Sequence, residues 1–220
     1  MAQSLLIPPL YAKTLAAFAT SPDDQLEALR WTLSAIEPEH RRPACPDVLD
    51  TMVMTPQGKR ETAYSALMRD GFIYMDIDRM AFRSFSDEEI EEQQAILSAY
   101  EVMAVVRSRV VRLSRSKRAL EARLAELSAA AQARSKIETI FGFQRLMLTI
   151  VAAIATERHM RAYIAVASVA DCYAWATRLP EQAIDDFLAK VENLYALYMA
   201  HDVTPAARLL TEIRAGHYSA

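Results

Sequence analysis

The longest regular pattern in the chain is a series of apolar side chains at alternating spacings of three and four between about residues 87 and 132. This spacing is typical of the heptad seam of a helix that packs along another helix. Ser86 with Glu89 forms a capping box at the start of the series, and no proline lies between Pro56 and Pro180. The pattern predicts one helix over about 87–132, with a seam interrupted at Lys117 and formed by Ile96, Ala99, Met103, Val106, Val110, Leu113, Leu120, Leu124, Leu127 and Ala131.

A second long apolar stretch follows a short connection near residues 130–134. Ser135 with Glu138 has the spacing of another capping box. From Ile137 onward the residues are apolar on nearly all faces, as expected for a helix surrounded by neighbours. We therefore predict a second helix over about 136–178, which folds back antiparallel on the first because the connection between them is short.

Shorter elements flank this hairpin. Apolar residues at helical spacing, with prolines at helix starts, predict two helices between Pro8 and about Ile36 and two more after Pro180. Residues 48–80 contain short apolar runs separated by turn signals, which predict a small three-stranded β-meander. A short helix ended by Gly71 is the alternative for this region.

The predicted fold is mainly α, close to all-α. It is a long antiparallel two-helix hairpin (about 87–132 and 136–178) packed with shorter N- and C-terminal helices. If the short apolar runs are strands, a small β-meander lies at about 48–80. Residues 1–85 would carry the N-terminal helices, a loop and the meander, and residues 86–220 the hairpin and the C-terminal helices, in one structural unit.

The composition of the 220-residue chain excludes several classes of function. Its four glycines are scattered, so the clustered glycines of a dinucleotide fingerprint or a Walker A loop are missing. Cys45 and Cys172 are too few and too far apart for a disulfide framework. No uncharged run approaches the roughly 18–20 residues of a membrane span. We therefore expect a soluble, cytoplasmic protein without a membrane span.

The most distinctive chemical feature is a basic run in the middle of the first long helix. Arg107, Arg109, Arg112, Arg115 and Arg118 fall in a stretch without acidic residues, mostly opposite the predicted seam. A cationic helix face of this kind could bind nucleic acid or another polyanion through its phosphates. The sequence leaves alternatives open: a solvated face, arginines paired with acids elsewhere in the fold, or a docking face for an acidic protein.

Charge is also segregated along the same predicted helix. Acidic residues cluster over 87–92, and the arginines follow in the middle. The acids suit the positive end of the helix dipole, which is a sufficient local reason for their position. If two copies of the helix paired antiparallel, crossing near residue 101, each acidic block would also lie beside the other copy's basic block. We therefore expect a homo-oligomer or a protein partner.

A polar patch in the second predicted helix is a further candidate site. Glu157, His159, Arg161 and Asp171 interrupt apolar surroundings, and Glu157 and Arg161 are spaced to pair on one helix face. These residues could form a polar layer or line a pocket. A stretch of helix exposed to solvent between two packing zones explains the same residues.

The remaining residues provide no catalytic, metal-binding or cofactor-binding set. Glu37 and His40 have a metal-ligand spacing, but Pro38 disrupts the helix that would aim both side chains at one ion. Cys45 lacks a base held beside it, which nucleophilic catalysis requires.

These observations favour a non-catalytic helical scaffold or assembly protein that acts through self-association or by docking a protein partner. The alternative is a polyanion- or nucleic-acid-associated protein that uses the basic face Arg107–Arg118. A second alternative is a ligand sensor or an enzyme whose site lies in the helical bundle, around the polar patch.

Overall fold

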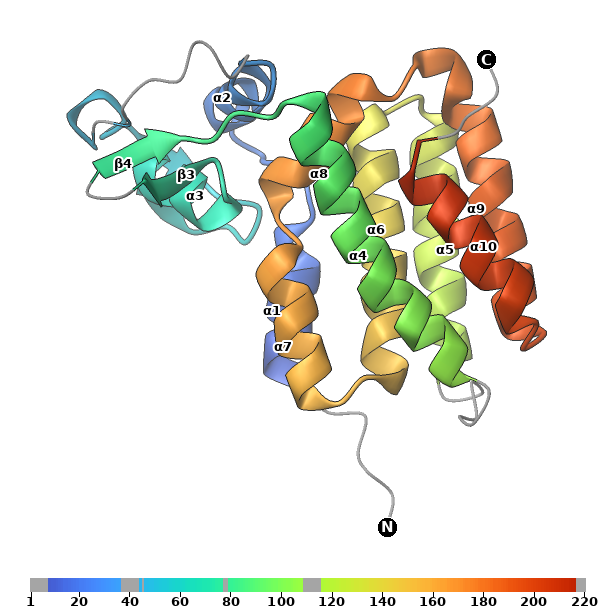
Figure 1. Ribbon diagram of the computed structural model, residues 1–220. Coiled ribbons are helices and arrows are strands. Elements are labelled where there is room, and N and C mark those ends of the chain that lie inside the picture. Colours follow the sequence, from blue (N-terminus) through green and yellow to red (C-terminus); the bar gives the residue numbers. More distant parts are fainter. Residues whose placement is uncertain (1–7, 37–43, 45, 77–78, 109–115, 217–220) are drawn as a thin grey trace.

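The protein consists mainly of helices, with two small antiparallel β-hairpins in the first half of the chain (Figure 1). The structure, a computed structural model, describes residues 8–36, 44, 46–76, 79–108 and 116–216. The predicted mainly-α fold class is confirmed. Helices α4 to α10 form a bundle, and α2, α3 and both hairpins gather at one end of it.

Helix α6 is the central helix of the bundle. Its residues from Thr139 to Gln144 are all buried, and neighbours on every side allow it to be mostly apolar all round. By length and composition α6 could cross a membrane, but 72% of its apolar window is buried inside the molecule. The bundle helices are α4 (Asp87–Arg107), α5 (Lys117–Gln132), α6 (Lys136–Ile154), α7 (Glu157–Val166), α8 (Val169–Arg178), α9 (Ile184–Met199) and α10 (Val203–Arg214), with a 3₁₀ turn η5 (Glu181–Ala183) before α9.

Helices α5 and α6 form the antiparallel hairpin of the bundle. In the connection Arg134 adopts a φ of 57°, and its amide donates to the carbonyl oxygen of Ala131 at 3.0 Å. Leu120, Leu127 and Ala131 are buried, as the predicted seam requires. The two helices cross so closely that a Cβ on Gly142 would lie 2.9 Å from the Cα of Leu127. Glycine at this position therefore sets the distance between the two helices.

The single helix predicted over 87–132 is wrong. The chain forms two helices, α4 and α5, and reverses direction between them (Figure 1). Serines lie at both ends of this break. The Ser108 hydroxyl donates to the carbonyl oxygen of Val105 at 2.7 Å, a side-chain hydrogen bond of the kind that competes with continuation of a helix. Ser116 is the N-cap of α5, without a side-chain cap hydrogen bond.

Helix α4 also buries a different face from the predicted one. Ile96, Met103 and Val106 are 38%, 43% and 46% exposed, and Ala99 is exposed as well. The buried face instead carries Ile90, Gln94, Leu97, Ser98, Glu101, Ala104 and Val105. Apolar side chains lie on both faces of α4, so their periodicity could not distinguish the inner face from the outer one.

The second predicted helix, over 136–178, is three helices, so the long hairpin reduces to α5 and α6. A hydroxyl N-cap restarts the helix at each break. Thr156 accepts from the amide of His159 at 3.3 Å, and Ser168 accepts from the amide of Asp171 at 3.1 Å. Each hydroxyl accepts a hydrogen bond from a backbone amide that has no partner in the first turn of the new helix. A break at these points therefore costs little free energy.

The two helices predicted between Pro8 and about Ile36 are present as α1 (Pro8–Ala17) and α2 (Asp24–Ser34). Helix α1 packs on the bundle, where the Tyr11 hydroxyl lies 2.9 Å from the Thr149 hydroxyl of α6. Helix α2 begins after its N-cap Asp23, whose carboxylate also accepts from the amide of Met54 at 3.0 Å. This cap therefore joins α2 to the first β-hairpin.

Between residues 48 and 80 the chain forms two separate hairpins with a helix between them, not a three-stranded meander. β1 pairs with β2 and β3 pairs with β4, both antiparallel. Gly71, at a φ of 90°, ends α3, so the helix alternative was the better prediction for that part. The elements in chain order are η2 (Pro46–Val48), β1 (Met52–Met54), β2 (Arg60–Thr62), α3 (Ala63–Asp70), β3 (Ile73–Asp76) and β4 (Arg79–Phe82).

Candidate functional site

Helix α8 joins the bundle to the N-terminal segment, a name used here for α2, β1, β2, α3, β3 and β4 (residues 24–82). It contacts α2 of that segment as well as α4 and α6 of the bundle. Four side chains of α8 contact different parts of this junction, namely Asp171, Tyr173, Trp175 and Arg178.

A buried arginine of α2, Arg30, anchors the N-terminal segment to this helix. Its Nε and Nη2 donate to Oδ2 of Asp70 at 3.0 and 2.6 Å, and its Nη1 donates to the Tyr173 hydroxyl at 3.4 Å. The Tyr173 hydroxyl donates in turn to Oε1 of Glu27 at 2.5 Å. Burial disfavours the charged guanidinium, but Asp70 more than compensates and raises the pKa of Arg30 above its ordinary value. One charged network therefore joins α2, the end of α3 and α8.

The connection from β4 to α4 is tied to α8 by two more arginines. Arg178 donates through Nη2 to the carbonyl oxygen of Phe85 at 2.7 Å and through Nε to Oδ1 of Asp87 at 2.6 Å. Arg83 places its Nη2 2.8 Å from Oδ1 of Asp171. Burial raises the pKa of Asp171, and Arg83 opposes that rise. Residues 83–87 are thus held against α8 on both sides.

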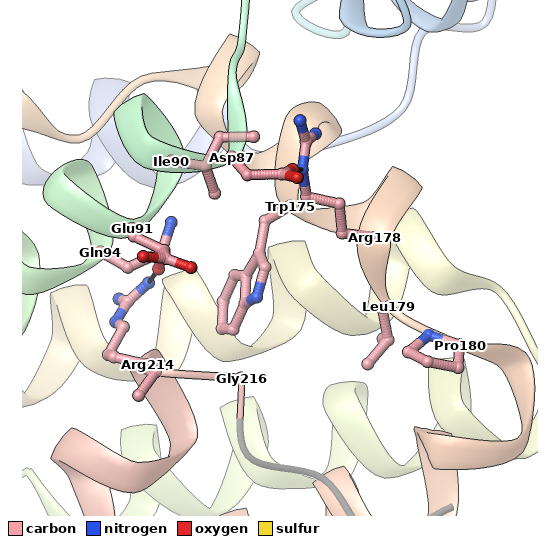
Figure 2. A pocket seen from close by; sticks show the side chains of 11 residues that line it. Asp87, Ile90, Glu91, Gln94, Trp175, Arg178, Leu179, Pro180, Arg214 and Gly216 are labelled. Carbon is pink, nitrogen blue, oxygen red and sulfur yellow. Dashed lines mark hydrogen bonds and ion pairs between the residues drawn. The ribbon is translucent and has the colours of Figure 1, made fainter.

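A cavity of about 280 Å³ lies beside this connection. Figure 2 shows the Trp175 indole among its lining residues, with Arg214 on one side and Leu179 and Pro180 on the other. Arg178 also lines the cavity. This volume is near the lower limit for small-molecule sites, about 300 Å³. The wall carries both signs of charge, which suits a small polar molecule. The other lining residues are Asp87, Ile90, Glu91, Gln94, Ala215 and Gly216.

Arg214, the last residue of α10, connects this cavity to a polar network inside the bundle. It donates through Nε to Oε2 of Glu101 at 2.9 Å, and its Nη2 contacts the other oxygen of the same carboxylate. It also donates to the side-chain oxygens of Gln94 and Gln144 at 2.8 and 3.0 Å. The Tyr163 hydroxyl donates to Glu101 at 2.7 Å and accepts from Gln144 at 2.6 Å. Helices α4, α6, α7 and α10 therefore share one network.

The electrostatics of the network keep its charges fixed. Glu101 is fully buried and Arg214 is 3% exposed, with the guanidinium 4.8 Å from the Phe143 ring centroid and 5.2 Å from that of Trp175. Burial disfavours the charge on Arg214, but Glu101 raises the pKa of the guanidinium above its ordinary value. Burial, followed by the Glu101 charge, raises the pKa of Tyr163 well above its ordinary value. Arg214 therefore stays charged and Tyr163 stays protonated near neutral pH, and their hydrogen bonds hold the cavity wall in place.

His159 of α7 is a second unusual buried group. Its side chain is 7% exposed, its ring centroid lies 5.5 Å from that of Tyr100, and neither ring nitrogen has a hydrogen-bond partner among the described residues. Burial lowers the pKa of His159; the Tyr100 backbone opposes this shift, and the nearby Arg107 adds to it. The imidazole is therefore poised to remain neutral.

Only the two ends of the predicted basic face can be placed. Arg107 at the end of α4 and Arg118 in the first turn of α5 are both exposed. Arg109, Arg112 and Arg115 lie outside the described residues. Because α4 and α5 are separate helices, Arg107 and Arg118 do not share the single straight helix face that the sequence predicted.

The four residues of the predicted polar patch are distributed over different surroundings. Glu157 and Arg161 form the expected pair, 2.7 Å apart, on the exposed side of α7. His159 faces inward against Tyr100, and Asp171 belongs to the junction at α8. These residues therefore do not line one pocket.

The structure adds no support for a catalytic or metal site at the other residues that the sequence analysis considered. Cys172 is buried, and burial raises the pKa of its thiol far above the ordinary value. Glu37, His40 and Cys45 lie outside the described residues. Within the described ranges, no three His, Cys, Asp or Glu side chains gather as they would around a metal ion.

Sequence reasoning missed the cavity and its network. One usable signal was present, because Gln94 and Glu101 are seven residues apart and so lie on the same helix face as Leu97. A polar pair within an apolar stripe suggests a buried network. Arg214 gave no such signal, since a cation in the last turn of a helix is ordinary.

The N-terminal segment presents a short helix followed directly by a β-hairpin. Arg69 on α3 and Arg79 at the start of β4 are exposed, as are Lys59 and Arg60 at the turn between β1 and β2. Arg69 is ion-paired with Asp70 at 3.0 Å and also with Glu61. Exposed basic side chains therefore lie on α3, at the start of β4 and at the turn between β1 and β2.

Comparisons with known proteins support the fold but show no family. No protein-family model matches the sequence, and no curated protein matches it. The solved structure of E. coli McbR/YncC is similar over 87% of this chain and 92% of that chain, with a TM-score of 0.57 and 16% sequence identity. At this identity the likeness concerns the fold alone. The similar region is longer than the part of the chain that forms the bundle helices, so it also includes residues that precede α4.

We predict that Arg214→Met destabilises the protein by about 3–5 kcal/mol, because the Glu101 carboxylate is left buried without its partner. Adding Glu101→Leu should recover much of this loss, because both charges are then gone. Denaturant unfolding of the wild type, both single variants and the double variant measures the coupling. Additive losses would show that the two side chains do not act as a pair.

We also predict that the wild-type protein loses stability as the pH falls through about 6.5, the ordinary pKa of histidine. The lowered pKa of folded His159 means that the unfolded chain binds a proton more readily, so acid favours unfolding. His159→Phe removes this titration and should flatten the dependence of the melting temperature on pH in this range. Identical pH profiles for the two proteins would contradict the assignment.

Proposed function

We propose that this chain is a nucleic-acid-associated regulatory protein and not a plain helical scaffold. In this proposal the N-terminal segment contacts nucleic acid, and the cavity at α8 admits a small molecule that alters the contact. The observation that carries it is helix α3 followed directly by the β3–β4 hairpin, on a segment fastened to the bundle at α8. E. coli McbR/YncC, whose fold is similar, lends support only at the level of the fold.

The N-terminal segment has elements of the right shape for a duplex. A helix and a two-stranded β-ribbon are the protein elements that the major groove admits, and α3 and the β3–β4 hairpin offer both. Exposed Arg60 and Arg79 provide cations for phosphate contacts, which position a protein on nucleic acid without reading its sequence. These features favour the N-terminal segment over the alternative basic face Arg107–Arg118 as the contact surface.

The junction suggests how a small molecule would act on this segment. Arg178 lines the cavity and also holds the carbonyl oxygen of Phe85, immediately before α4. A molecule that displaces the Arg178 side chain would release Phe85 and Asp87 from α8 and would leave the pair of Arg83 with Asp171 in place. Because the pair of Arg178 with Asp87 is largely exposed, breaking it costs little. A bound molecule could therefore change the position of the segment at a small energetic cost.

Binding of a labelled mixed-sequence DNA duplex, followed by fluorescence anisotropy over a series of salt concentrations, tests the nucleic-acid contact. We expect binding that weakens steeply with salt, since phosphate contacts release counterions. Arg60→Gln with Arg79→Gln should flatten the plot of log affinity against log salt by roughly 0.9 per contact removed. The matched control is Arg107→Gln with Arg118→Gln, which should leave the slope unchanged.

Two outcomes would contradict this part of the proposal. If the wild type shows no salt-dependent binding, the association with nucleic acid is wrong. If only the control pair flattens the slope, nucleic acid binds at the end of α4 and the start of α5, and the N-terminal segment is not the contact surface.

The cavity can be tested separately by filling it. Ala215→Trp places a large side chain at the cavity, where Ala215 is one of the lining residues. We expect the DNA affinity of this variant to differ from the wild type, and the difference to vanish when Arg178→Ala is added, because the link to Phe85 is then lost. Ala122→Trp, on the exposed face of α5, is the control. Equal affinities for Ala215→Trp and the wild type would show that the cavity and the N-terminal segment are not coupled.

A further inference from the structure

The outer face of α4 is an apolar stripe on the surface of the bundle. Ala95, Ile96, Ala99, Met103 and Val106 are all exposed, and their spacing places them along one side of the helix. In Figure 1 α4 crosses the front of the bundle, with α7 and α10 on either side of it. Ile96, Met103 and Val106 are 38%, 43% and 46% exposed, and the other large apolar side chains exposed to a similar or greater degree among the described residues, Met52, Met68 and Met75, lie on the N-terminal segment.

Charges of opposite sign lie at the two ends of this stripe. Exposed Glu88, Glu91 and Glu92 precede it, and exposed Arg107 follows it. Among the described residues, Glu92 and Arg107 have no ion pair within 4 Å. A face with acid at one end, base at the other and apolar residues between is complementary to a copy of itself in the opposite direction.

We infer that two copies of this chain pair antiparallel through the outer face of α4. The midpoint between Glu92 and Arg107 falls between Ala99 and Tyr100, and the midpoint between Ile96 and Met103 falls at the same place. A two-fold axis at that point therefore sets Glu92 beside the second copy's Arg107 and Ile96 beside its Met103. At 3.6 residues per turn, these four positions lie on the same flank of α4. A two-fold axis perpendicular to two antiparallel helices places this flank of one copy beside the same flank of the other.

Small side chains at the centre favour this pairing. Ala99 lies next to the axis and Ala95 one turn before it, so the two helices can approach closely, since interaxial distance depends on the side chains at the contact. A nucleic acid does not fit the same face, because Glu88, Glu91 and Glu92 would repel its phosphates. The inference is independent of the proposed function, which concerns the N-terminal segment.

Sedimentation velocity of the full chain over a range of protein concentrations tests the pairing. We expect a reversible dimer in the wild type. Ala99→Glu would place two like charges across the axis and should weaken the dimer by at least about tenfold. Because Ala99 is exposed, the melting temperature of the monomer should not change. Ala122→Glu, on the exposed face of α5, is the matched control and should dimerise like the wild type.

A charge exchange tests the antiparallel register. Glu92→Arg alone and Arg107→Glu alone each bring like charges together and should weaken the dimer, whereas the double variant restores opposite charges and should restore dimerisation. A wild type that stays monomeric at every concentration would overturn the inference, as would a dimer that Ala99→Glu leaves intact. A double variant no better than either single variant would overturn the antiparallel arrangement.

Discussion

The buried pair of Glu101 with Arg214 is the interaction on which the arrangement of the bundle depends. A buried carboxylate without a cation would be very costly, so α4 must turn Glu101 toward α10, and Gln94 then turns the same way. Gln144 and Tyr163 complete the hydrogen bonds of the pair. Replacing a buried ion pair by well-packed apolar residues is often neutral or stabilising, so we infer that the contribution of this pair is a defined rotation of α4 about its axis.

That rotation has consequences on both sides of α4. On the inner side, Gln94 and Arg214 become part of the wall of the cavity at Trp175. On the outer side, the apolar residues from Ala95 to Val106 are left facing solvent. The ligand site and the dimer surface that we propose thus follow from one buried ion pair, although they lie on opposite faces of the same helix.

Helix α8 is where the two parts of the molecule are connected. Its Tyr173 reaches the Arg30 network of α2, and its Arg178 holds the connection before α4. Breaking the contact at Arg30 costs more free energy than breaking the contact at Arg178, because the Arg30 side chain is fully buried whereas that of Arg178 is a third exposed. We infer that the Arg30 network keeps the N-terminal segment attached, while the contact at Arg178 is the one that a ligand can change.

The sequence by itself determined the mainly-α fold class, the position of the short connection between α5 and α6, and several helix starts, including the Ser86 and Glu89 capping box, because these depend on local spacing and capping. It did not determine where the long helices break, although the serines and threonines that cap the new helices were visible. Only the tertiary structure decided which face of α4 is buried, since both faces carry apolar residues and the choice depends on Arg214, 113 residues away from Glu101. The cavity was invisible in the sequence for the same reason: its wall is assembled from residues that become neighbours only when α4, α8 and α10 pack together.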